Sequence, residues 1–417
     1  MEKTHAFKLA GTAMFILSAA TSALAADGFK LRFPISGTLG GEIVAPLPSE
    51  GWVGSMAITD VNVDRVTGND GNTLTLQKAV GLDFSTLNAV GVGAKLTTAA
   101  STNPSLAGAL ATVVAPPSTT LGTVAAGQLA GKSASATPTT LADIKQRLTL
   151  ANLTFARLLS PDVQGGKLAL AINIPYALSM NVSSGFSGPT ISSLNWTTPP
   201  GAPTTPQVAG LASNVVNSGY QASLASQGQS ASVNTSGLGD IETSLLWEKT
   251  VDKFKIVGGA TLALPTGNYS YTEGAMKPNI GYGKYYTFRP GVGVAYNASE
   301  NVTLGVRGSL GFNTQNTENK VRSGDFYVID LAAAFKTPVG VFGPHVTMLR
   351  QYTDDKKNGQ IDTLLGANRV SITGAGAFAT FPIKSIGAGL NLSYMKTIDT
   401  RNSLSGSFVQ ARLSKAF

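Results

Sequence analysis

The sequence predicts an all-β fold: a transmembrane antiparallel β-barrel of about 12 strands, with 14 as the alternative, and long extracellular loops. Three observations lead to this prediction. Apolar and polar residues alternate along segments of roughly ten residues or more, the length that a tilted strand needs to cross a bilayer. Long and short connections alternate between these segments, as they do in barrels of bacterial outer membranes. After the N-terminus, no stretch offers the roughly 18 consecutive apolar residues of a membrane-spanning helix.

Residues 1–25 have the pattern of a signal peptide. Lys3 and Lys8 precede an apolar run that ends in small residues, where a signal peptidase would cleave. A single N-terminal membrane anchor is the alternative, but the run is short and rich in Ala, Ser and Thr. An exported chain with strands of spanning length belongs in the bacterial outer membrane. For residues 26–50 the sequence leaves two interpretations open, a periplasmic lead-in or a small plug inside the barrel.

The predicted barrel occupies residues 51–417, with extracellular insertions at 66–146 and 181–238. Side chains of a strand alternate between its two faces, so Arg307 is expected to point away from Leu304 and Leu310. The same period places the even-numbered residues from Leu168 to Met180 on one apolar face. The predicted strands are 52–63, 147–159, 167–180, 239–250, 253–264, 282–296, 300–313, 324–336, 339–352, 368–380, 384–397 and 402–417.

The two insertions carry almost no charge. Residues 96–131 contain no charged side chain, which favours a flexible low-complexity loop, with a partly ordered apolar cap as the alternative. Residues 73–96 could add a hairpin, which would raise the number of strands to 14. The second insertion holds Phe186, Trp196 and Tyr220 among small polar residues. These three aromatic residues are candidates for the capture of an apolar solute.

Composition argues against several functions. The chain has no cysteine and only two histidines, so disulfides and zinc sites built from Cys and His are excluded, and we expect neither a cofactor nor catalysis. The net charge of +8 is spread along the strands instead of forming a basic patch, and we therefore expect no nucleic-acid partner.

Charged residues that the alternation turns inward are the candidate lumen lining. An Arg that faces lipid at mid-depth costs about 2 to 4 kcal/mol, so the inward placement is favoured. Two interpretations stay open: these charges pair and hold the wall in shape, or they line and filter a pore. The terminal Phe417 is the candidate signal for the barrel assembly machinery. The lumen-lining candidates are Lys167, Glu242, Glu248, Arg289, Arg307, Asp330, Arg369 and Arg412.

Several short motifs resemble the outer-membrane protein family named for the meta pathway of phenol degradation. The resemblance covers residues 237–417 well and 39–71 weakly, and the two uncharged insertions depart from it. It implies a channel for aromatic or other hydrophobic compounds, with outer-membrane lipid and the solute as partners. The alternative function is a surface adhesion or structural barrel. The motifs lie at 237–240, 264–269, 285–290, 312–314, 323–326 and 351–355.

Overall fold

A computed structural model of the chain describes residues 51–77, 79–101, 107, 110–111, 113–114, 119–198, 203–271, 279–358, 360–361 and 369–417. The predicted signal peptide and residues 26–50 lie outside the described residues. The described chain forms two compact units. The barrel unit comprises residues 51–74, 143–184 and 231–417, and the insertion unit comprises residues 75–142 and 185–230.

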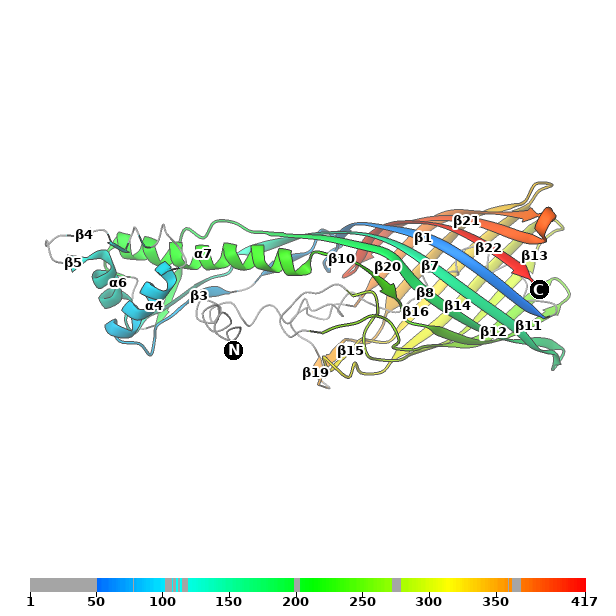
Figure 1. The fold of residues 1–417 in the computed structure, drawn as a ribbon, viewed down its shortest axis with the longest axis horizontal. Helices are drawn as coiled ribbons and strands as arrows, with labels where there is room; N and C mark the ends of the chain where they lie inside the picture. Colours follow the sequence, from blue (N-terminus) through cyan, green and yellow to red (C-terminus); the bar gives the residue numbers. More distant parts are fainter. Residues whose placement is uncertain are drawn as a thin grey trace, which may run out of the picture. The chain divides into compact units, whose positions relative to one another are not determined.

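Twelve strands form a closed antiparallel barrel, which confirms the predicted fold and strand number (Figure 1). The barrel closes where β1 pairs with β22, from Val53 opposite Ala416 to Val66 opposite Leu404. Closure leaves no sheet edge exposed, as lipid requires. In spatial order the strands are β1 (Trp52–Val66), β7 (Thr139–Val163), β8 (Gly166–Ser187), β11 (Glu242–Val251), β12 (Phe254–Ala263), β13 (Thr287–Asn297), β14 (Val302–Asn313), β16 (Phe326–Lys336), β17 (Val341–Gln351), β20 (Ser371–Ile383), β21 (Ala388–Arg401) and β22 (Leu404–Ala416).

Short connections gather at one end of the barrel, here called the turn end, and the opposite end is called the loop end. Gln164 and Gly165 have φ values of 55° and 73°, which suits the two-residue turns that join antiparallel strands. Asp252, in the turn between β11 and β12, has a φ of 50°. At the loop end the connections are longer, apart from the two-residue turn at Asn402 and Ser403 between β21 and β22.

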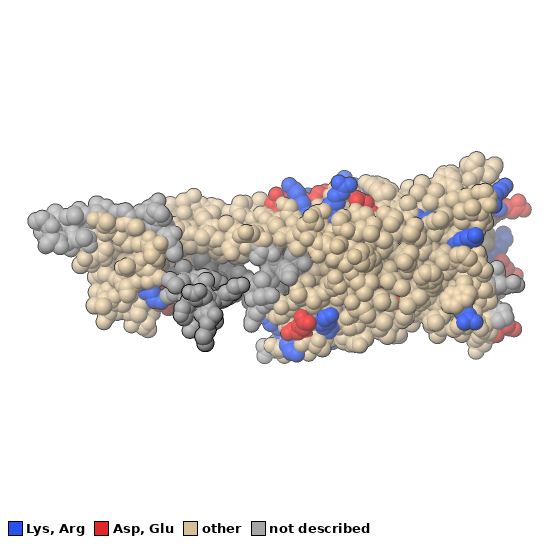
Figure 2. All heavy atoms as spheres, viewed as in Figure 1, with Lys and Arg blue, Asp and Glu red and all other residues tan. Residues whose placement is uncertain are grey.

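The outward face of the barrel is apolar between its two ends. Leu304 and Leu310 on β14 are 47% and 44% exposed, and Arg307 between them points inward to Asp330, so the predicted register of this strand is confirmed. On the face that Figure 2 shows, charged side chains gather at both ends of the barrel with almost none between. This apolar belt is the surface that a transmembrane barrel presents to lipid. None of the helices in the described part of the chain is long and apolar enough to cross a membrane.

Because of a bulge in β8, Met180 lies on the face opposite to the predicted one. Leu170 and Leu178 are 47% and 50% exposed, as expected, but Met180 is only 3% exposed. β10 (Val233–Leu238) pairs with the upper part of β8, and its register shifts between Thr235 and Gly237. The extra residue on β8 reverses the alternation of side chains beyond it. The prediction that Met180 shares the outward face is therefore wrong.

The insertion unit is a folded body of helices and short strands. Strands β3, β6 and β9 form an antiparallel sheet, and β4 pairs with β5. Loop strands β15 (Val321–Arg322), β18 (Lys356–Lys357) and β19 (Gln360–Ile361) and the short helix η1 (Lys384–Ile386) belong to the barrel unit. The elements of the insertion unit are β2 (Thr75–Gln77), β3 (Val80–Asp83), α4 (Ala89–Ser101), β4 (Val113–Val114), β5 (Thr119–Thr120), α6 (Leu121–Leu129), β6 (Ser133–Ala136), β9 (Asn195–Thr198) and α7 (Pro206–Ala231).

Helical spacing of apolar residues explains why this unit folds. On α7 the buried residues recur every three or four positions, which places them on one face of the helix. They pack against α4, α6 and the three-stranded sheet in one hydrophobic core. For the residues of 96–131 that lie in α4 and α6, the interpretation as a flexible low-complexity loop is therefore wrong. The barrel has 12 strands, so the alternative count of 14 is wrong as well. The buried residues of α7 are Val208, Leu211, Ala212, Val216, Tyr220 and Leu224.

Candidate functional site: the barrel lumen

A chain of polar contacts crosses three neighbouring strands on the inner wall. Arg307 on β14 and Asp330 on β16 are register partners, and Arg307 Nε donates to Asp330 Oδ2 at 2.9 Å. Arg307 Nη2 contacts the same oxygen. The other carboxylate oxygen of Asp330 accepts a hydrogen bond of 2.7 Å from Thr347 Oγ1 on β17. Because Asp330 is only 4% exposed, these contacts offset much of the cost of burying its charge.

A second inward ion pair spans one intervening strand. Arg289 Nη2 on β13 lies 2.6 Å from Glu242 Oε1 on β11, and β12 runs between these two strands. The side chain of Arg289 is 5% exposed and that of Glu242 is 23% exposed, so the guanidinium is nearly withdrawn from water and the carboxylate is partly buried. The first ion pair joins two neighbouring strands, and the second joins the two strands on either side of β12. Pairs of this kind can hold the wall in shape, which is one of the two interpretations of the inward charges.

Three further lumen-lining candidates also lie on strands of the barrel. Lys167 on β8 is the register partner of Glu248 on β11, and Glu248 is 6% exposed. Arg412 on β22 is the register partner of Asn391 on β21. Arg369 is different, because β20 begins only at Ser371. Arg369 lies in the preceding loop, where its Nε donates to Asp354 Oδ1 at 2.8 Å, so its predicted position on a strand is wrong.

Apolar side chains also face inward, and the sequence analysis did not single them out. A cluster near the loop end combines residues of β16, β17 and β20, and a second cluster near the turn end combines β16 and β20. A third cluster lies on β1, β21 and β22. The inner wall is therefore mixed, with ion pairs from β11 to β17 and apolar clusters from β16 round to β1. The buried inward apolar residues include Phe326, Val328, Leu349, Ile372, Ala332, Ala334, Phe378, Met395 and Phe408.

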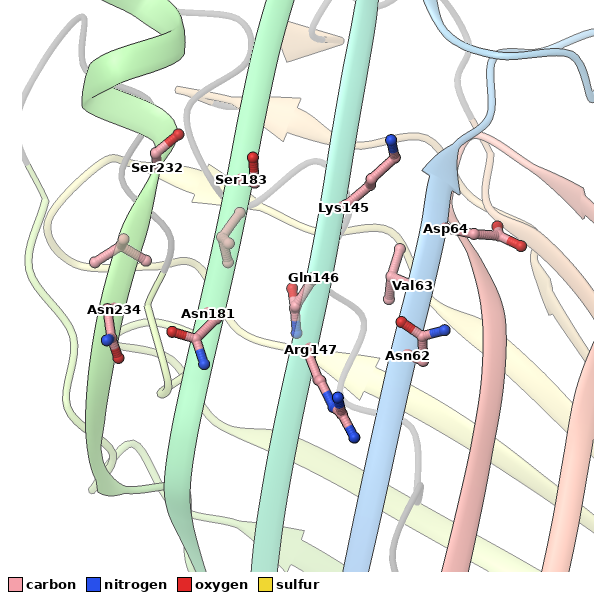
Figure 3. A pocket seen from close by; sticks show the side chains of 12 residues that line it. Asn62, Val63, Asp64, Lys145, Gln146, Arg147, Asn181, Ser183, Ser232 and Asn234 are labelled. Carbon is pink, nitrogen blue, oxygen red and sulfur yellow. The ribbon is translucent and has the colours of Figure 1, made fainter.

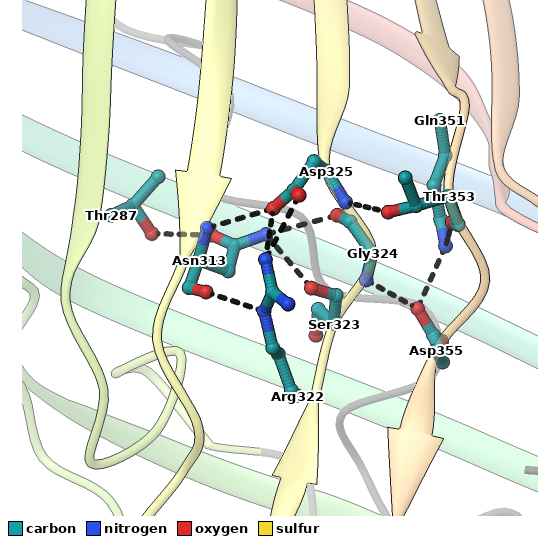
Figure 4. Close-up of polar contacts among 9 residues, drawn as sticks. All are labelled: Thr287, Asn313, Arg322, Ser323, Gly324, Asp325, Gln351, Thr353 and Asp355. Atoms are coloured by element: carbon teal, nitrogen blue, oxygen red, sulfur yellow. Dashed lines mark hydrogen bonds and ion pairs between the residues drawn. The ribbon is translucent and has the colours of Figure 1, made fainter. Parts of the chain in front are cut away.

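A hydrogen-bonded hub at Asp325 joins three loop-end segments (Figure 4). Arg322 Nη2 donates to both carboxylate oxygens of Asp325 at 3.0 and 2.9 Å, and the backbone N–H of Asn313 donates to Asp325 Oδ1 at 3.2 Å. The backbone N–H of Asp325 donates to Thr353 Oγ1 at 2.7 Å. Asp355 Oδ1 accepts from the backbone N–H of Gly324 at 2.7 Å. The hub thus ties the ends of β14 and β17 to the start of β16.

Asp240 forms a second hub in the segment between β10 and β11. Its Oδ1 accepts from the backbone N–H of Gly267 and its Oδ2 from that of Tyr282, each at 2.9 Å. Thr266 Oγ1 accepts from the backbone N–H of Ile241 at 2.9 Å. The family motifs quoted above therefore contribute directly to the two hubs. Sequence reasoning found the motifs without assigning them this role, because the hydrogen bonds join residues from separate loops.

An outer groove with a volume of about 710 Å³ lies on β1, β7, β8 and β10 (Figure 3). On β7 the side chain of Arg147 is 72% exposed, and its Nε lies 3.5 Å from Asp60 Oδ2 on β1. Asp60 also accepts a hydrogen bond of 3.2 Å from Thr149 Oγ1. Ile58, two residues before Asp60, is 37% exposed, so these charges mark the loop-end border of the apolar belt. The groove is lined by Asn62, Val63, Asp64, Lys145, Gln146, Arg147, Asn181, Val182, Ser183, Ser232, Val233 and Asn234.

The three capture candidates contribute to the core of the insertion unit. Tyr220 is 3% exposed, and its hydroxyl lies 2.7 Å from Thr140 Oγ1. Phe186 and Trp196 are partly buried and pack against the same core. This packing already explains why they are apolar. Their role in solute capture stays a prediction.

His345 lies on the inner wall, and Phe417, the candidate assembly signal, lies at the turn end. His345 on β17 is 2% exposed, and its Nε2 lies 3.1 Å from the backbone oxygen of Tyr394. The described residues contain no group of three or more acidic or His side chains that would hold a metal ion. Phe417 closes the barrel: its N–H donates to the backbone oxygen of Trp52 at 2.8 Å, and Trp52 N–H donates back at 3.3 Å.

Comparisons with known proteins agree with this architecture. No curated protein sequence matches the chain. The crystal structure of the COG4313 outer membrane channel from Pseudomonas putida F1 is similar, with a TM-score of 0.54 and 11% identity over 89% of this chain and 97% of that chain. The CymD monoaromatic hydrocarbon channel and the Ralstonia pickettii toluene transporter TbuX each match with a TM-score of 0.34 and 10% identity. Each match covers 89% of this chain, and it covers 89% of the CymD chain and 90% of the TbuX chain.

A family profile gives the assignment. The profile described as "Putative MetA-pathway of phenol degradation" matches residues 132–413, which is more than half of the chain. The likeness to the COG4313 channel establishes a shared fold, at an identity too low to establish more. The chain therefore belongs to the family of the MetA pathway of phenol degradation, and its barrel has the architecture of a bacterial outer-membrane channel.

Proposed function

We propose that this chain is an outer-membrane channel for the passive uptake of small hydrophobic or aromatic compounds. The observation that carries the proposal is the mixed inner wall of the barrel. Phe326, Phe408 and Met395 face inward although the outward belt already provides the apolar surface that the membrane requires. Such side chains offer no hydrogen bonds to a hydrophilic solute, whereas an apolar and aromatic lining favours the binding of apolar ligands.

Family membership supports the same conclusion. The family is described by a pathway of phenol degradation, and the similar structure from Pseudomonas putida F1 is described as a channel. We assign the loop end to the outside of the cell, the apolar belt to contact with outer-membrane lipid, and Phe417 to recognition by the barrel assembly machinery. No catalytic step is needed, since the solute crosses down its concentration gradient.

A surface adhesion barrel is the second candidate function. The insertion unit favours it, because a folded body whose longest helix, α7, has no charged residue is not required for conduction. Helix α7 is rich in Ser, Asn and Gln, which suit contacts with another surface. The two functions make opposite predictions for cells that lack the protein.

The deciding experiment compares a deletion strain with the same strain carrying the gene. At limiting concentration, the channel function predicts slower uptake of a labelled monoaromatic compound in the deletion strain, with sugar permeation unchanged. Cells with a complete lipopolysaccharide layer are needed, because apolar solutes cross phospholipid bilayers without a channel. Unchanged uptake together with reduced adhesion would exclude the channel and support the adhesion barrel.

A further inference from the structure

The outer groove lies at the loop-end border of the apolar belt, and all of its lining residues belong to the barrel unit. Strand registers show which of its side chains face outward. Asn62 on β1 shares a face with Met56 and Ile58, which are 50% and 37% exposed on the belt, because side chains alternate along a strand. Arg147 on β7 is opposite Asn62, and Lys145 follows two residues further on the same face. Both cations therefore project from the outer wall (Figure 3).

The two cations are exposed and only loosely paired. The side chain of Arg147 is 72% exposed, and its Nε lies 3.5 Å from Asp60 Oδ2. The side chain of Lys145 is 63% exposed, and its Nζ lies 3.5 Å from Asp143 Oδ2. Exposed ion pairs of this kind contribute little to stability, so an incoming anion can compete for either cation. Because carboxylates alternate with the cations, direct contacts and not a broad positive field must hold such an anion.

Neutral hydrogen-bonding side chains line the rest of the groove. Asn181 on β8 and Asn234 on β10 are register partners, and both are exposed. They line the same groove as Arg147, and Asn62 lines it on the other side of Arg147 (Figure 3). A side-chain amide offers two donors and an acceptor oxygen, which suits the hydroxyl groups of a sugar. The groove thus combines positions for an anionic group with positions for a carbohydrate.

Apolar surface begins directly beside these polar residues, towards the turn end. In the first row Asp60 is followed, across β22 and β21, by Val409 and Tyr394, which are 55% and 46% exposed. In the next row Ile58 and Leu392 are 37% and 42% exposed. A Tyr at this level is typical of the boundary between water and lipid. A molecule whose polar part occupies the groove can therefore extend acyl chains along the belt.

We propose that the groove binds a phosphorylated glycolipid of the outer leaflet. A phosphate contacts Arg147 and Lys145, since a guanidinium matches the geometry of phosphate oxygens. The sugar that carries the phosphate exchanges hydrogen bonds with Asn62, Asn181 and Asn234, and the acyl chains lie against the apolar belt. Lipopolysaccharide has this chemistry. The inference rests on the assignment of the loop end to the outside of the cell, and it does not depend on which solute the barrel conducts.

Binding of lipid A, the phosphorylated and acylated part of lipopolysaccharide, to the purified full-length protein in detergent tests the proposal. The double variant Arg147→Gln/Lys145→Gln removes both cations, and because both side chains are exposed it should keep the heat-modifiable migration of the wild type. Arg157→Gln is the matched control, since Arg157 is an exposed cation on the same face of β7 at the turn-end border of the belt. EDTA prevents divalent cations from bridging the phosphates to Asp60 or Asp64.

The double variant should bind lipid A about tenfold more weakly than the wild type, as loss of one charge-assisted hydrogen bond implies. Arg157→Gln should match the wild type. Lipid A without its phosphates should bind equally to the wild type and the double variant, which would assign the loss to the phosphate.

Three results would overturn the site. These are equal affinity of the wild type and the double variant for lipid A, an equal loss in Arg157→Gln, and binding of phosphatidylglycerol by the wild type as tight as that of lipid A. None of these measurements involves solute uptake, so failure of the site would leave the channel function standing.

Discussion

Arg307 and Asp330 are direct register partners on neighbouring strands, and both point into the barrel. Thr347 adds a hydrogen bond to the same carboxylate, so three strands share one polar contact. Asp330 is only 4% exposed and its two carboxylate oxygens are both engaged, so the pair counts first as a structural element of the wall.

Breaking this pair on one side should destabilise the barrel strongly. Asp330→Leu removes the carboxylate that Arg307 contacts, and the Arg307 side chain is only 24% exposed, so we expect a loss of about 3 kcal/mol in the free energy of unfolding. Replacing both residues by Met removes the unpaired charge, so the double variant should be less destabilised than the single one. Urea unfolding in lipid vesicles measures both. Equal losses in the two variants would show that the ion pair does not hold the wall.

The hub at Asp325 should control the order of the loop end. Asp325→Asn removes the charged partner of Arg322, and we expect a loss of about 1 to 2 kcal/mol together with faster hydrogen exchange at residues 352–358. Asp70→Asn is the matched control, since Asp70 is a loop carboxylate whose hydrogen bonds reach only the nearby Asn72. Equal exchange rates in both variants would argue against a special role of Asp325.

The insertion unit should unfold independently, while the barrel stays folded. Leu211 on α7 is 3% exposed within the core of that unit, so Leu211→Ala should cost about 2 to 5 kcal/mol there. Limited proteolysis should then cut residues 185–230 more rapidly, while heat-modifiable migration of the barrel stays unchanged. The exposed Val90 on α4 provides a control position, because it is 81% exposed. A simultaneous loss of barrel mobility would contradict two separately folded units.

Two changes at Phe417 distinguish its role in closing the barrel from its role in recognition by the barrel assembly machinery. Deleting Phe417 removes the backbone hydrogen bonds to Trp52, whereas Phe417→Ala keeps them and removes only the 74% exposed ring. We expect the deletion to lower both barrel stability and assembly in cells. The alanine variant should fold normally in vitro but assemble slowly in cells. Normal assembly of the Phe417→Ala variant in cells would show that the aromatic ring is not an assembly signal.

The loop ion pair between Asp354 and Arg369 predicts a dependence on pH. Hydrogen bonds from the Arg369 guanidinium lower the pKa of the Asp354 carboxyl group. A carboxyl group whose pKa is lowered by folding stabilises the folded loop above its unfolded pKa of about 3.9. That contribution is lost as the pH falls through the folded pKa. Proteolysis of the loop should therefore accelerate at low pH in the wild type, and Arg369→Gln should flatten this pH profile.

The barrel could be predicted well because one simple period governs it. Along β14 the alternation of Leu304, Arg307 and Leu310 is uninterrupted, so each side chain could be assigned to a face. The same rule failed at Met180, where the register of β8 against β10 shifts between Thr235 and Gly237 and the faces are reversed. Gly237 has a φ of 145°, a conformation that glycine adopts readily. Nothing in the local alternation of β8 announces this bulge.

Features that depend on distant contacts were missed. The hubs at Asp240 and Asp325 join separate loops, so their motifs could be recognised but not explained from the sequence. The insertion unit was missed for another reason. Its helical spacing, from Val208 to Leu224 on α7, is visible in the sequence, but an uncharged segment rich in small residues is also typical of a low-complexity loop.

The most direct test of the channel is uptake of a labelled monoaromatic compound at limiting concentration by cells with and without the protein. Both strains need the same lipopolysaccharide, and a labelled sugar serves as the internal control for general leakage. The account predicts that uptake of the aromatic compound rises severalfold with the protein present while uptake of the sugar does not. Equal uptake of the aromatic compound in both strains would contradict it.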